Sequence, residues 1–202
     1  LEAAGEEGPY LLVAHGFGGI YTRIWAGEHP DDVCGMVLVE SSHPDMLAYF
    51  EEHGVIPDVP DRNVRTLIAL LSQLGSPGRY KGNIYDIPDE IYDPIQAYMP
   101  ESSMAWFDEK VETPTSLAQA AQYEHLGSFP LILIATSATR SSVDKIASLN
   151  TAWLELQQDL LTLTDNSELR EQNFGHYPQI DQPDVVIQAI LDVLEQCDGN
   201  PH

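Results

Sequence analysis

Residues 10–40, which read YLLVAHGFGGIYTRIWAGEHPDDVCGMVLVE, place two apolar runs on either side of a glycine-rich turn and a helix-like segment. The runs at 10–14 and 35–39 are short and continuously apolar, as expected for strands buried on both faces. Between them, glycines permit a tight turn, and apolar residues recur at helical spacing up to His29 and Pro30. This strand–helix–strand order predicts two parallel strands of one sheet.

The remaining sequence predicts further layers and an insertion. Scattered prolines and an amphipathic segment indicate a helical cap or lid at residues 44–127, inserted between the two parts of the main domain at 1–43 and 128–202. We expect this cap to cover the carboxyl ends of the strands, where open α/β sheets bind ligands. Further elements are expected at 65–74 (helix), 130–135 (strand), 149–163 (helix), 169–173 (strand) and from 181–183 onward (helix). The predicted fold class is α/β, a parallel sheet flanked by helices.

Composition excludes several classes of partner. The 202 residues carry nine basic and 32 acidic side chains, a net charge of −23, which would repel nucleic acid and an anionic membrane surface. No apolar run reaches the roughly 20 residues of a membrane-spanning helix. Cys34 and Cys197 are too few for a disulfide framework and too isolated for a zinc site, so we expect two structural thiols, no metal and no cofactor. The segment from Leu1 to Gly8 has no signal-peptide pattern and is typical of the tail of a helix.

The segment LVAHGFGG at 12–19 has the strand–turn–helix context of a nucleophile elbow, G-x-S-x-G. Ala14 takes the place of the first glycine and is still small. Gly16 stands where the serine is expected. Glycine tolerates the strained backbone of such a turn but has no hydroxyl, so no acyl-enzyme can form there.

Five motifs in order resemble the α/β-hydrolase superfamily, in particular its esterase-like and lipase-like members. They are the elbow at 14–19, His-Pro-Asp at 29–31, Glu-Ser-Ser-His-Pro at 40–44, Phe-Gly-His-Tyr at 174–177, and Asp-Gln-Pro at 181–183. The resemblance implies a carboxylic ester or related acyl compound as the ancestral substrate. It also implies that the chain is the C-terminal half of the fold, with the first strands and the loop of the second oxyanion donor expected before Leu1.

The resemblance implies specific catalytic roles. His176 would act as general base and acid, and the backbone N–H of Phe17 would donate to an oxyanion. Two carboxylates are candidates for the acid: Glu40, 24 residues after Gly16, and Asp144, after the strand at 130–135. We favour Glu40, because Asp144 lies several residues beyond the end of its strand.

Other polar and aromatic side chains receive lesser roles. His15 is expected to pack beside the elbow, while Ser41, Ser42 and His43 are expected to line the pocket without transferring protons. Candidate substrate-binding residues in the cap are Tyr92, Tyr98, Trp106 and Phe107, which could equally form the core of the cap.

A second alignment competes with this interpretation. Residues 13–19 also resemble the His-Gly loop that supplies an oxyanion donor after an earlier strand of the same fold. The helix expected at 20–29 leads directly to the strand at 35–39, as it does after an elbow, and no G-x-S-x-G occurs downstream. We therefore favour the elbow.

Three functions are compatible with these residues. The first is an esterase-related protein, impaired or inactive as a serine hydrolase because Gly16 replaces the nucleophile. The second is a non-catalytic module that binds a small apolar ester-like ligand or a protein. The third retains catalysis, with His176 activating water directly. With the first strands of the fold expected before Leu1, we expect one edge of the elbow strand to be unpaired within this chain. A second copy of the chain or a missing N-terminal half is expected to cover it.

Overall fold

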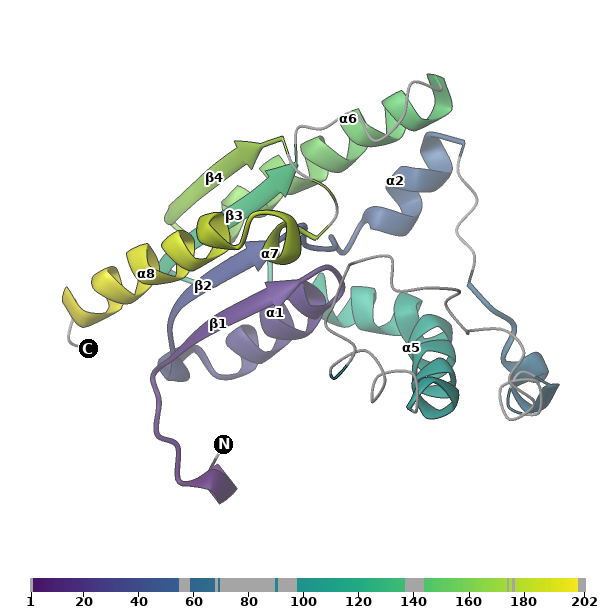
Figure 1. The fold of residues 1–202 in the computed structure, drawn as a ribbon, viewed down its shortest axis with the longest axis horizontal. Coiled ribbons are helices and arrows are strands. Elements are labelled where there is room, and N and C mark those ends of the chain that lie inside the picture. Colours follow the sequence, from purple (N-terminus) through teal and green to yellow (C-terminus); the bar gives the residue numbers. More distant parts are fainter. Residues whose placement is uncertain are drawn as a thin grey trace. The chain divides into compact units, whose positions relative to one another are not determined.

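The computed structural model describes residues 2–54, 59–67, 69, 90, 98–136, 144–173, 175 and 177–199. Its centre is a four-stranded sheet in which every strand is parallel to its neighbours (Figure 1). The strands lie in the order β1 (Tyr10–His15), β2 (Val33–Val39), β3 (Pro130–Thr136) and β4 (Asn166–Gln172). The predicted parallel α/β architecture is confirmed.

Helices connect and cover these strands. The connection from β1 to β2 is α1 (Gly18–Glu28) with the 3-10 turn η2 (Pro30–Asp32), and β3 is joined to β4 through α6 (Asp144–Asp159) and η4 (Leu160–Leu163). The other described helical segments are η1 (Glu2–Ala4), α2 (Met46–Glu52), η3 (Arg62–Val64), α5 (Met99–Ala120), α7 (Pro178–Asp181) and α8 (Pro183–Gly199). The helix expected at 149–163 is thus α6 followed by a tighter turn, and the strand expected at 169–173 begins earlier, at Asn166.

Alternate residues of the two central strands build two separate cores. Met36 and Leu38 of β2 face α1 and η4, and pack with Leu160 and Leu163. The intervening residues of the same strand face the opposite side and pack against α8, which crosses that face in Figure 1. Both β2 and β3 are buried at every position, because helices cover both faces.

The first strand departs from the prediction. It was expected to be buried on both faces, but β1 lies at the edge of the described sheet, with β2 as its described neighbour. Its residues are mostly half-buried, and the side chain of Val13 is 46% exposed. The apolar run therefore predicted the strand correctly but overpredicted the burial of its side chains, whereas the unpaired edge agrees with the expectation for the elbow strand.

The two cysteines correct a second expectation. Cys34 in β2 and Cys197 in α8 form a disulfide with Cα atoms 5.3 Å apart, although 163 residues separate them in sequence. The packing of α8 across β2 brings them together. Gly35 allows this approach, because a Cβ at that position would overlap the side chain of Val193. The bond therefore fastens the C-terminal helix to the middle of the sheet.

The chain divides into two compact units. One contains Leu1–Pro57 and Ser116–His202, and the other is Asp58–Thr115. In the second unit Arg65 makes a two-pronged ion pair with Asp108. Most of the helix expected at 65–74 lies outside the described residues, and the boundaries proposed for the cap remain a prediction.

No helix within the described ranges combines the length and apolarity needed to cross a lipid bilayer.

Candidate active site

Gly16 lies in a tight turn directly after β1. Its φ of +56° is in the left-handed region, where glycine is favoured. The Gly16 N–H donates to the carbonyl of Val39 at 3.1 Å, and its own carbonyl accepts from the N–H of Ser42 at 2.9 Å. The turn is thus fixed to the end of β2 by two backbone hydrogen bonds, and α1 begins two residues later.

Space is available beside Gly16. An ideal Cβ built on this residue meets no atom of the described residues within 4 Å, whereas a Cβ on Gly19 would overlap the hydroxyl of Ser41. Gly19 is therefore required for the close approach of α1 to the β2 loop. At Gly16 the backbone angle is the only constraint, and a serine side chain could be accommodated.

Glu40 occupies the equivalent point on the neighbouring strand. Its carboxylate is fully buried and accepts a hydrogen bond from the backbone N–H of Thr136 at 2.6 Å, while its own N–H donates to the carbonyl of Ile134 at 2.8 Å. Its φ of +46° is unusual for a residue with a side chain. Strained backbone of this kind occurs preferentially at functional sites, which is consistent with the role expected for Glu40.

Phe17 lies between the glycine turn and α1. It is the N-cap residue of this helix, with a φ of −66° and a ψ of −19°. Backbone N–H groups at a helix N-terminus have no intrahelical acceptor and carry a partial positive charge. The predicted oxyanion donor is therefore in a segment suited to stabilising negative charge beside Gly16.

Several predicted residues cannot be placed. His176 and Tyr92 lie outside the described residues, and for Asp144 the structure describes only the backbone, as the first residue of α6. In the second compact unit, Tyr98 and Trp106 are exposed and Phe107 is buried. The roles of these residues remain predictions.

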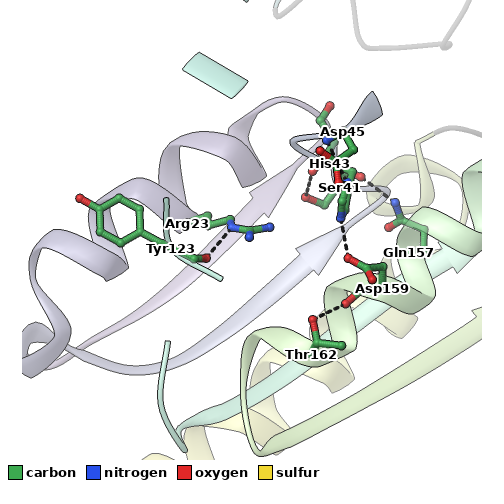
Figure 2. A network of polar contacts seen from close by, with 9 residues as sticks. Arg23, Ser41, His43, Asp45, Tyr123, Gln157, Asp159 and Thr162 are labelled. Carbon is green, nitrogen blue, oxygen red and sulfur yellow. Dashed lines mark hydrogen bonds and ion pairs between the residues drawn. The ribbon is translucent and has the colours of Figure 1, made fainter. Parts of the chain in front are cut away.

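His43 is buried, and both of its ring nitrogens have partners (Figure 2). Nε2 lies 2.9 Å from a carboxylate oxygen of Asp159, and Nδ1 accepts a hydrogen bond from the backbone N–H of Asp45 at 3.0 Å. This pairing requires the neutral tautomer with its proton on Nε2. Burial lowers the pKa of His43 below its ordinary value, and this effect exceeds the opposing influence of Asp159. The residue therefore joins the β2 loop to the end of α6.

Two further contacts complete the surroundings of the elbow. The buried amide of Gln157 donates to the carbonyl of Ser41 at 2.7 Å, which ties α6 to the residue after Glu40. The ring of His15 packs at 5.3 Å from that of Tyr177, as expected for a packing residue. Where the structure is described, no three His, Cys, Asp or Glu side chains converge to form a metal site.

Comparison with known proteins gives relatives at low identity. No family model matches the chain. The uncharacterized protein YqjL of Bacillus subtilis (strain 168) is 24% identical over 195 residues, which are 96% of this chain and 60% of that protein. The chain thus spans about three fifths of the length of this relative.

Solved structures resemble the chain more clearly. A protein from Nostoc sp PCC 7120, provisionally assigned as an alpha/beta hydrolase, superposes with a TM-score of 0.63 at 16% identity, covering 96% of this chain and 68% of that one. A loop variant of a haloalkane dehalogenase from Bradyrhizobium elkanii gives 0.61 at 16% identity, covering 96% and 70%. The chain has the α/β-hydrolase fold. In this fold the glycine turn after β1 and the loop after β2 lie at the carboxyl ends of adjacent strands, where ligands of open parallel sheets bind.

The sequence indicated Gly16 and Glu40 as candidates but gave no sign of the residues that hold Glu40 and the loop after β2. Thr136 contacts Glu40 through its backbone N–H, which carries no sequence signal. Asp159 and Gln157 project from α6 and look like ordinary polar residues of an amphipathic helix. The run Ser-Ser-His-Pro did indicate that His43 lies near the strand end, but not that Asp159 is its partner.

Proposed function

We propose that this protein is an α/β-hydrolase-fold relative of carboxylic ester hydrolases that binds an ester-like ligand and is impaired or inactive as a serine hydrolase. One observation carries the proposal. The elbow turn has the backbone and the open space that a nucleophile needs, yet Gly16 supplies no attacking atom. The fully buried Glu40 beside it supports the assignment of this turn as the former reaction centre.

The reaction that Gly16 cannot support is the two-step hydrolysis of an ester. A serine hydroxyl at position 16 would attack the ester carbonyl, His176 would take its proton, and the carboxylate of Glu40 would orient that histidine. The alcohol would leave with the proton, and water would then release the acid. Without the hydroxyl, no bond to the ester carbonyl carbon can form. The backbone N–H groups at the start of α1 would still bind the carbonyl oxygen.

The alternative function is a non-catalytic module on the same fold that binds a ligand or a protein. The space beside Gly16, where no atom of the described residues lies within 4 Å of an ideal Cβ, supports the approach of a ligand atom at this point. The two proposals predict different reactivity for a serine introduced at position 16.

A fluorophosphonate probe distinguishes them. An activated serine displaces fluoride from the probe's phosphorus and becomes covalently labelled, whereas an unactivated hydroxyl does not. We expect no labelling of the natural chain at position 16 and labelling of Gly16→Ser, lost again in Gly16→Ser/His176→Ala. Absence of labelling in a folded Gly16→Ser variant would favour the non-catalytic module.

We also propose that β1 is covered in the assembled protein, either by a second copy of the chain or by a further part of the fold. The exposed side chain of Val13 and the position of β1 at the edge of the described sheet support this. Unpaired backbone groups along an edge strand are ready to pair with another strand.

A further inference from the structure

A pocket of about 320 Å³ has a lining that includes neither Gly16 nor Glu40. Its polar side chains come from α1, the loop after β2, the segment after α5, the end of α6 and η4. The polar side chains that line it are Arg23, His43, Asp45, Glu124, Asp159 and Thr162. The elbow residues 14–19 and Glu40 are absent from this lining.

Arg23 is the distinctive feature of this pocket. The residue is only 7% exposed, and its Nε–H donates to the carbonyl of Tyr123 at 2.9 Å. Within the described part of the chain, its two terminal nitrogens make no hydrogen bond or ion pair. Figure 2 shows the guanidinium extending from α1 into the space beside His43 and Asp159. Its terminal nitrogens are not among the fully buried atoms of the described residues that have no partner, so they reach the space of the pocket and can donate to a ligand there.

Carboxylates lie near this guanidinium without pairing with it directly. Asp45, Glu124 and Asp159 all act electrostatically on Arg23. Asp159 is held by His43, which is neutral in the tautomer that its contacts require. One cation thus faces three carboxylates, so the pocket as a whole would repel a simple anion.

We infer that this pocket binds a small molecule carrying one carboxylate and one or two ammonium groups, namely a free basic α-amino acid such as lysine or arginine. Its carboxylate would accept from the terminal nitrogens of Arg23, and its ammonium groups would face Asp45, Glu124 and Asp159. The pattern of one positive and three negative side chains is the complement of that ligand. The volume is at the small end of ligand pockets, which fits a molecule of this size.

The ligand would use charge-assisted hydrogen bonds at both ends. Hydrogen bonds between a guanidinium and a carboxylate are about twice as strong as those between neutral groups. Their planar, two-pronged geometry could not be formed by a lysine side chain in place of Arg23. Arg23 should therefore govern the recognition of the carboxylate, and the exposed carboxylates should govern the preference for a basic side chain. The site does not depend on any residue of the elbow.

Isothermal titration calorimetry with the full chain tests the inference. L-Lysine and L-arginine are the probes, and L-glutamate, n-butylamine and glucose are the comparison compounds. We expect saturable binding of the two basic amino acids and at least about tenfold weaker binding of each comparison compound. Arg23→Gln should weaken lysine binding at least about tenfold, and Asp159→Asn should weaken it several-fold.

Matched controls keep the result decisive. Arg62→Gln and Asp165→Asn alter exposed charges outside the pocket and should leave lysine affinity unchanged. If Arg23→Gln fails to fold by circular dichroism, Asp159→Asn, at a largely exposed residue, carries the test. Equal affinity for lysine and glutamate, lysine affinity unaffected by either pocket variant, or no saturable binding up to about 10 mM would overturn the inference.

Discussion

Gly16 and Glu40 follow directly after His15 and Val39, which are paired in neighbouring parallel strands, and both have a φ in the left-handed region. The chain therefore turns away from the sheet at the same level in two adjacent strands. Glycine adopts such a backbone without strain, but glutamate does not. The acidic residue at this level therefore has a strained backbone, whereas the residue at position 16 is a glycine without a side chain.

The glycines of the elbow should respond differently to alanine. Gly16→Ala should cost about 1–2 kcal/mol in free energy of unfolding, from backbone strain alone. Gly19→Ala should cost more, because the added methyl meets Ser41, and Gly18→Ala should be neutral or stabilising, since its Cβ makes only ordinary contact. Urea unfolding followed by circular dichroism measures all three. A Gly16→Ala variant no less stable than Gly18→Ala would contradict the elbow geometry.

The disulfide should contribute strongly to stability. A bond that closes a loop of 163 residues restricts the unfolded chain, an effect of about 5 kcal/mol in the chain-entropy model. Adding a reductant should lower the urea midpoint of the natural protein to that of Cys34→Ser/Cys197→Ser, and the double variant should not respond to reductant. If the natural protein has the same urea midpoint with and without reductant, while mass spectrometry shows both thiols to be free, the disulfide does not stabilise the fold.

His43 should make stability depend on pH. Because burial lowers its pKa in the folded state, the unfolded chain takes up a proton first as the pH falls. Its contribution is therefore complete above the unfolded value of about 6.5 and is lost progressively as the pH falls from there toward the folded pKa. Urea midpoints from pH 8 to 5 should show this decline, and it should be smaller in His43→Gln.

The exposed His29 provides the matched control for this measurement. His29→Gln should retain the pH dependence of the natural protein. If His43→Gln and His29→Gln give the same curve as the natural protein, the buried pair with Asp159 has no role in it.

The edge position of β1 predicts association in solution. If the 202-residue chain is studied alone, light scattering at micromolar concentration should show a dimer, and Val13→Lys should favour the monomer by placing a charge on the exposed edge. Thr151→Lys, on the exposed surface of α6, controls for added charge. A monomer at all concentrations, with β1 protected from hydrogen exchange, would show that this edge needs no cover.

The sequence predicted the fold well because the deciding pattern is local. Two apolar runs flanking a glycine turn and a helix define a βαβ unit, and residues 130–135 match β3 to within one residue. The disulfide was not predictable in this way. It depends on how distant segments pack, since Cys34 and Cys197 meet only after α8 has crossed the sheet.

The candidate site could be predicted only in part for a related reason. Gly16 and Glu40 lie at strand ends, where short motifs identify them. Arg23 and Asp159 belong to the polar faces of helices, where a buried arginine cannot be distinguished from a solvated one without knowing what packs above it. The burial of Arg23 is a property of the tertiary structure.

Restoring the nucleophile needs controls that separate geometry from chemistry. Gly16→Ala reports the cost of a side chain at this φ, and Gly16→Ser/His176→Ala and Gly16→Ser/Glu40→Gln report whether the serine depends on its expected partners. The last of these keeps an acceptor for the N–H of Thr136 and so preserves the contact that holds Glu40 in place.

The most direct test of the central claim is the hydrolysis of a short-chain p-nitrophenyl ester by the natural protein and by Gly16→Ser. Removing members of a catalytic triad typically leaves only about 10³–10⁴-fold catalysis over water, so restoring the serine should raise the rate by several orders of magnitude where the second oxyanion donor of the fold is also supplied. Without that donor the rise should be smaller, by about 10²–10³-fold. The gain should disappear in the His176 and Glu40 double variants. Equal rates for the natural protein and a folded Gly16→Ser variant would show that more than the nucleophile has been lost and would contradict the claim that this turn is an impaired serine-hydrolase site.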